Sequence, residues 1–74
     1  MVFADDIRKT ILKLAEERGS DKSFAPWEVA RAVDQENWRM IIDQVTFVAG
    51  VLIREGKIIA ISRSKRSQRF RKTL

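Results

Sequence analysis

The chain has 74 residues, with 15 Lys or Arg, 10 Asp or Glu and a formal net charge of +5. This length fits a single domain, residues 1–74, near the lower size limit for a self-sufficient hydrophobic core. Because the sequence has no Cys and no His, disulfides, thiolate or imidazole zinc sites and catalysis by these side chains are excluded.

An apolar stripe predicts a first helix over residues 4–18. Asp5 and Asp6 fall in its first turn, where carboxylates complement the positive end of the helix dipole. Gly19 follows as a stop signal. The stripe consists of Phe3, Ile7, Ile11, Leu14 and Ala15.

A second helix is predicted over residues 26–34. It is expected to begin at Pro26, because proline at the first helical position loses no hydrogen bond. Glu28 would be the acidic member of a capping box, although the cap position, Ala25, offers no side-chain oxygen.

The third and longest helix is predicted over residues 38–55, with Asn37 as its N-cap and Gly56 as its left-handed C-terminal stop. We interpret Trp38 as a core anchor, because it lies on the inward stripe. The second and third helices and their tight turn read as a helix-turn-helix. The inward stripe consists of Trp38, Ile41, Ile42, Val45, Val48, Ala49, Leu52 and Ile53.

A β-hairpin is predicted over residues 57–72. Residues 57–62 are short and β-branched, and residues 68–72 can return as a second strand. A strand of one or two residues at Ser23–Phe24 would complete the sheet. The predicted fold is therefore α+β, mainly α: a winged helix-turn-helix with three helices followed by a two-stranded wing. A three-helix bundle with a disordered basic tail is the alternative.

Five short motifs follow one another along the chain: Pro26-x-Glu28-Val29-Ala30-Arg31, Trp38-Arg39, Val45, Ala49-x-x-Leu52 and Gly56-x-Ile58. In this order they resemble a family of small bacterial proteins known only as a domain of unknown function. The resemblance implies a winged helix and attaches no activity to it. Three features depart from the family pattern: Ala25 replaces a capping Ser, Thr46 stands where Arg is frequent, and the wing lacks a Gly-rich tip.

In a helix-turn-helix, outward side chains of the second helix meet base edges in the major groove. Arg39 is placed to bind guanine and Gln44 to bind adenine. Asp43 opposes this function, because a carboxylate among phosphates is repelled unless it accepts from cytosine.

The same helix has a second apolar stripe at Met40, Phe47 and Val51. We interpret it as core, because a long central helix contacts several elements. A protein contact or a homodimer seam is the alternative.

Positive charge is concentrated in the wing. Residues 1–53 sum to −2 and residues 54–74 to +7, which suggests a polyanion partner, nucleic acid before an anionic membrane surface. A solvated basic tail without a partner is the alternative. Basic side chains bind phosphates by releasing counterions, without sequence-specific geometry. The candidate phosphate-binding residues of the wing are Lys57, Arg63, Lys65, Arg66, Arg69, Arg71 and Lys72.

The strand register determines whether the hairpin offers a further interaction surface. If Ile58 and Ala60 face the core, then Ile59 and Ile61 point outward and form an exposed edge that invites a partner chain. In the opposite register Ile59 and Ile61 are core, and the sequence alone does not decide between the two.

Together these features predict a non-enzymatic protein that binds nucleic acid, DNA more than RNA, through its basic wing and third helix. A protein-interaction or dimerisation module without nucleic-acid binding is the alternative. No glycine loop, nucleophile–base pair or calcium-loop spacing is present, so we expect no catalytic residue, metal, cofactor or small-molecule substrate. No segment approaches the roughly 18 apolar residues of a membrane span, so a cytoplasmic location without membrane insertion is expected.

Overall fold

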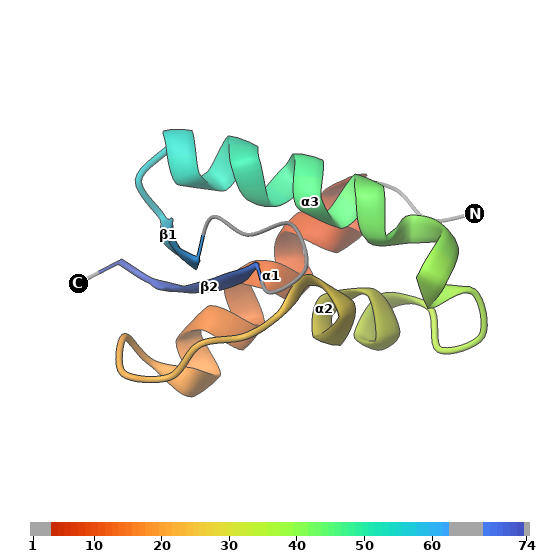
Figure 1. The fold of residues 1–74 in the computed structure, drawn as a ribbon, viewed down its shortest axis with the longest axis horizontal. Helices are drawn as coiled ribbons and strands as arrows, with labels where there is room; N and C mark the ends of the chain where they lie inside the picture. Colours follow the sequence, from red (N-terminus) through yellow and green to blue (C-terminus); the bar gives the residue numbers. More distant parts are fainter. Residues whose placement is uncertain (1–3, 63–67, 74) are drawn as a thin grey trace.

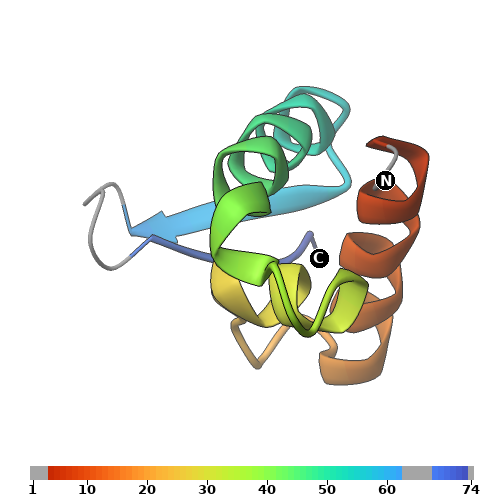
Figure 2. The same ribbon diagram turned by 90° about the vertical axis from the view of Figure 1, so that its right-hand side faces the viewer.

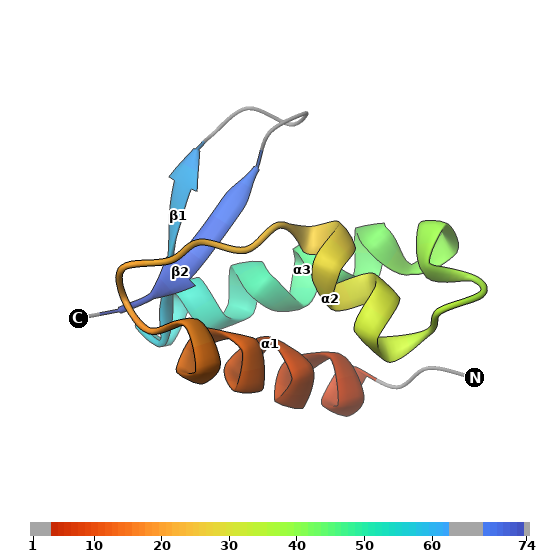
Figure 3. The same cartoon turned by 90° about the horizontal axis from the view of Figure 1, so that it is seen from below.

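The computed structural model describes residues 4–62 and 68–73. Three helices, α1 (Ala4–Arg18), α2 (Pro26–Val33) and α3 (Trp38–Arg54), precede an antiparallel hairpin of β1 (Ile58–Ser62) and β2 (Arg69–Lys72) (Figure 1). Each helix contacts the other two, and the hairpin projects to one side of them (Figures 2 and 3).

The predicted α+β class and the order of its elements are confirmed, and the layout is consistent with a winged helix. Because β2 pairs with β1, the alternative of a three-helix bundle with an unpaired tail is wrong. Among residues 4–62 and 68–73, no helix combines the length and apolar character needed to cross a membrane.

The helix ends follow from local backbone chemistry. Gly19 and Gly56 have φ of +70° and +79°, so both supply the left-handed conformation that ends α1 and α3 as predicted. Asn37 occupies the predicted N-cap position of α3, but its side chain makes no capping hydrogen bond. Instead the Oδ1 atom of Asp34 accepts from the backbone N–H groups of Glu36 at 3.2 Å and Asn37 at 3.1 Å. The carboxylate of Asp34, directly after α2, thus organises the turn.

The sheet includes one residue from the connection between α1 and α2. Phe24 and Phe70 exchange two backbone hydrogen bonds of 2.8 Å, which confirms the predicted minimal third strand. The two rings also lie close, with centroids 6.0 Å apart and planes tilted by 48°. Both side chains are almost fully buried. This pair therefore joins the hairpin to the helices through backbone and side chains together.

The register of β1 is now defined. Ile58 is fully buried opposite Lys72, whereas Ile61 is 51% exposed and Ile59 is half-buried. The ladder is irregular between Ala60 and Ser62, so simple alternation does not continue along the strand. Ala60, the second residue expected to face the core in this register, is exposed.

The core lies between the three helices and the hairpin. The prediction that Met40 and Phe47 are core residues is wrong: they are 81% and 69% exposed, and Val51 is half-buried. Within the described part of the chain, the other elements pack on the opposite stripe of α3 and leave this face uncovered. The buried apolar residues are Ile7, Ile11, Ala15, Phe24, Ala25, Val29, Ala30, Ile41, Val45, Val48, Ala49, Leu52, Ile58 and Phe70.

Substitution of two phenylalanines tests which side chains belong to the core and which to the surface. Phe70→Ala should lower the free energy of unfolding by about 3–5 kcal/mol, because it leaves a cavity and separates the hairpin from Phe24. Phe47→Ala is the matched control and should change it by less than about 0.5 kcal/mol. Urea denaturation at low micromolar protein concentration measures both. Equal costs for the two substitutions would contradict the assignment of Phe70 to the core and Phe47 to the surface.

Candidate nucleic-acid interface

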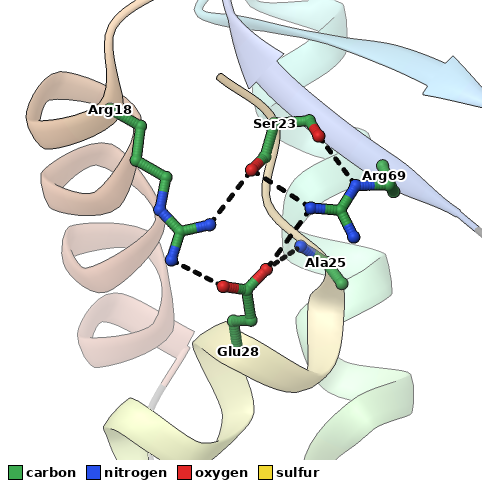
Figure 4. A network of polar contacts seen from close by, with 5 residues as sticks. All are labelled: Arg18, Ser23, Ala25, Glu28 and Arg69. Atoms are coloured by element: carbon green, nitrogen blue, oxygen red, sulfur yellow. Dashed lines mark hydrogen bonds and ion pairs between the residues drawn. The ribbon is translucent and has the colours of Figure 1, made fainter.

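A network of polar contacts centred on Glu28 joins α1, α2 and β2 (Figure 4). The Oε2 atom of Glu28 accepts from the backbone N–H of Ala25 at 2.7 Å, so the acidic half of the predicted capping box is present. The guanidinium of Arg18 lies 2.5 Å from Oε1, and that of Arg69 lies 3.8 Å from Oε2. Both arginines also donate to the backbone carbonyl of Ser23, at 3.0 and 3.2 Å, and Arg69 donates to its Oγ at 2.7 Å.

The environment of Glu28 shifts its protonation equilibrium. Burial would raise the pKa of this carboxyl, but the hydrogen bonds from Arg18 and from the Ala25 N–H, with the positive charges of Arg18 and Arg69, hold its pKa below the ordinary value. The side chain of Glu28 is only 17% exposed. The network is therefore formed by an ionised carboxylate that is largely shielded from water.

Three cations predicted to bind phosphates contact the protein itself. Arg69 belongs to the network around Glu28. Arg71 donates to the backbone carbonyl of Ser20 at 2.9 Å, and the ammonium of Lys72 lies 3.0 Å from the carboxylate of Glu16 on α1. These side chains fasten β2 to α1 and to the connection that follows it. The charges of Arg69 and Lys72 are thus partly neutralised by carboxylates within the fold.

The other cations predicted on the wing fall into two groups. Lys57 is exposed at the base of the hairpin, where its backbone carbonyl accepts from the N–H of Thr73 at 3.3 Å. Arg63, Lys65 and Arg66 lie outside the described residues. The sequence places all three in the connection between the two strands.

A second cationic cluster lies where α2 and α3 meet. The guanidinium of Arg31 on α2 is 5.9 Å from the ring centroid of Trp27 and 6.0 Å from that of Trp38. The guanidinium of Arg39 is 5.2 Å from the Trp38 ring. Both arginines are exposed, Trp27 is 46% exposed, and Trp38 is half-buried against the core. We call these four residues the Trp/Arg cluster.

Sequence reasoning singled out Arg39 but missed Arg31. The available signal was the spacing of Trp27 and Arg31, which are four residues apart on one helix and therefore share a face. Positions this close allow a cation to rest on an aromatic ring. The position of Trp38 between two guanidinium groups depends on how α2 meets α3, which the spacing alone does not give.

Gln44 does not join the Trp/Arg cluster. It lines a hollow together with Phe47, Ile7 and Ala4, and its neighbour Asp43 is exposed. Thr46 donates its hydroxyl to the backbone carbonyl of Ile42 at 3.1 Å. The two predicted base-reading residues, Arg39 and Gln44, thus have different neighbours. In the segments that the structure describes, no group of three or more acidic, His or Cys side chains is arranged to hold a metal ion.

The network makes stability depend on pH in a defined direction. Because the pKa of Glu28 is lowered in the folded state, its contribution is complete well above the ordinary value of 4.5 and is lost as the pH falls below it. Glu28→Gln should reduce the free energy of unfolding at pH 7 by about 1–3 kcal/mol. It should also flatten the decline in stability on acidification. Urea denaturation at several pH values measures the free energy of unfolding, and Glu36→Gln at an exposed position is the control. If the stability of Glu28→Gln fell on acidification as steeply as that of the native protein, the role of the network would be contradicted.

The family model described as "Protein of unknown function (DUF3253)" matches residues 4–67. No curated protein matches the chain. The family match agrees with the resemblance carried by the motifs in α2 and α3, and it spans all three helices and β1. The chain therefore belongs to the DUF3253 family of proteins of unknown function.

Proposed function

We propose that the protein binds nucleic acid, with duplex DNA as the principal partner, through contacts to phosphates. The observation that carries this proposal is the net charge of +7 over residues 54–74 in a segment whose hairpin projects to one side of the helices (Figure 3). Arg69 and Lys72 are paired with carboxylates. The principal phosphate contacts are therefore assigned to Arg63, Lys65 and Arg66, between the strands.

The Trp/Arg cluster supports the same function from the helix-turn-helix. A guanidinium that rests on an aromatic ring is restrained, while its N–H groups stay available to phosphate oxygens. Arg31 and Arg39 are both exposed, and phosphate contacts of this kind position a protein on a duplex without reading its sequence. We therefore assign these two arginines to the interface and omit Gln44, which lies beside Phe47.

Charge reversal in the segment between the strands tests the phosphate contacts assigned to it. Lys65→Glu/Arg66→Glu should weaken binding to a random-sequence duplex and reduce the magnitude of its log–log salt slope by about 2, since each phosphate contact contributes roughly 0.9 on B-DNA. Fluorescence anisotropy at several salt concentrations measures both quantities. Lys9→Glu/Lys13→Glu on α1 is the matched control, because it changes the net charge equally at exposed positions. Equal losses of affinity in the two variants would show that overall charge, and not the position of Lys65 and Arg66, causes the effect.

A second test concerns the Trp/Arg cluster. Arg31→Gln/Arg39→Gln should weaken duplex binding at every sequence to a similar extent and lower the slope by up to about 2. The circular dichroism spectrum and the midpoint of thermal unfolding should show that the variant is folded. A folded variant that binds with unchanged affinity would remove the helix-turn-helix from the interface and leave the hairpin as the binding element.

A second function, as a protein-interaction module, is supported by a different observation. Met40 and Phe47 are 81% and 69% exposed on α3, and a reader of nucleic acid gains nothing from large apolar side chains in water. Isolated exposed apolar residues are common, but contiguous apolar surface marks interaction sites. This face is distinct from the Trp/Arg cluster and from the hairpin.

A further inference from the structure

The exposed side of α3 forms one continuous strip. In an α-helix, residues three, four, seven and eleven apart share a face. By this spacing Phe47 lies at the centre of the strip, with a charged residue toward each end. Val51 is half-buried and Gly50 partly exposed, whereas the remaining members are exposed. We call this strip the outer face of α3, composed of Met40, Asp43, Phe47, Gly50, Val51 and Arg54.

Shallow hollows lie on both sides of Phe47 where α3 passes the start of α1. One is lined by Ala4, Ile7, Gln44 and Val48, and the other by Ala4, Val48 and Val51, among others. Each has a volume of about 300 Å³, whereas an apolar cavity of about 150 Å³ accepts benzene. The surface therefore offers both a protruding ring and apolar space large enough to receive one.

The fold of a single chain does not explain why residue 50 is glycine. Gly50 lies in the middle of α3, where glycine is less favourable than alanine because it loses more conformational freedom on folding. Its φ is not positive, and a Cβ added there would meet nothing within 4 Å among the described residues. Neither backbone conformation nor internal packing requires glycine at this position. A close approach by another chain does supply a reason.

The charges on the outer face specify how such a chain would lie. Asp43 and Arg54 are eleven residues apart, which is about three turns or 16 Å along the helix. Two copies of the strip in parallel would place Asp43 beside Asp43 and Arg54 beside Arg54. In the antiparallel arrangement each Asp43 meets an Arg54, and the two helix dipoles also oppose each other favourably. The charge pattern is therefore complementary to itself in one orientation.

We propose that two copies of this protein pair through the outer face of α3, with the helices antiparallel about a two-fold axis that crosses this face midway along the helix between Asp43 and Arg54. This axis places the ring of Phe47 over Gly50 of the other copy, where the missing Cβ leaves room. It also forms two equivalent Asp43–Arg54 ion pairs, as an isologous interface requires. A face one helix wide belongs to the weak class of interfaces, below about 1,200 Å².

This pairing rests on the second proposed function, the protein-interaction module, and is independent of nucleic-acid binding. Neither Arg31 nor Arg39 belongs to the outer face, and the hairpin is a separate element that contacts the opposite stripe of α3 through Ile58. A dimer of this kind presents two Trp/Arg clusters and two hairpins. Failure of the dimer leaves the phosphate contacts of one copy in place, and failure of duplex binding leaves the dimer in place.

Sedimentation equilibrium tests the pairing without nucleic acid. The native protein should be in reversible monomer–dimer equilibrium at up to several hundred micromolar, as expected for a weak interface. Phe47→Ala should raise the Kd at least about tenfold. Gly50→Ala should raise the Kd while it raises the midpoint of thermal unfolding of the dilute monomer by about 2–8 °C. If Gly50 had only a structural role in the monomer, Gly50→Ala would change the thermal midpoint without raising the Kd.

Charge exchange tests the orientation. Asp43→Arg and Arg54→Asp should each abolish self-association, whereas the double exchange Asp43→Arg/Arg54→Asp should restore it. The two single variants, when mixed, should form a heterodimer, because every pair across the axis then has opposite signs. Asp21→Arg in the exposed turn after α1 controls for the change in net charge. A native protein that stays monomeric at several hundred micromolar would overturn the proposal, as would a double exchange that fails to associate although it is folded.

Discussion

One carboxylate determines how the elements of this small domain are held together. Glu28 stands at the first turn of α2, where it accepts from the N–H of Ala25 and meets the guanidinium groups of Arg18 and Arg69. A shielded charge is tolerated only where such partners surround it, because removal from water disfavours the ionised form. The partners come from α1, β2 and the connection before α2. The helix start and the positions of two neighbouring elements therefore depend on the same side chain.

This arrangement changes the meaning of the basic composition. The excess of positive charge after residue 53 suggests a uniformly available basic surface, yet Arg69, Arg71 and Lys72 hold β2 against the rest of the protein. Cations that bind carboxylates or carbonyls of their own fold contribute less to the field that a polyanion meets. The strands of the hairpin are thus held by some of their arginines and lysines. The phosphate contacts that we propose therefore lie in the connection between the strands and at the Trp/Arg cluster.

Features that depend on nearby residues were predicted well from the sequence, whereas contacts between distant residues were predicted less well. The inward stripe of α3, the left-handed glycines and the short pairing at Phe24 all rest on spacing and backbone chemistry, and all are present. The N-cap position at Asn37 was predicted correctly, but its capping hydrogen bond was not formed, because side-chain type alone does not say that Asp34 holds the N–H groups of the turn before α3. The stripe at Met40 and Phe47 was assigned to the core because periodicity identifies a helix face but does not say what covers it. The contact between Arg31 and Trp38 likewise depends on tertiary packing.

The pairing of Phe24 with Phe70 has a consequence for the order in which the chain can fold. The three helices can form from nearby residues, but the backbone N–H and C=O of Phe24 obtain their partners only from a residue 46 positions later. Contacts between such distant positions slow folding, because the intervening chain must first be ordered. During synthesis, the helices must wait for residue 70 before the core is closed. Until then the apolar surface beneath the hairpin is open to solvent and to other chains.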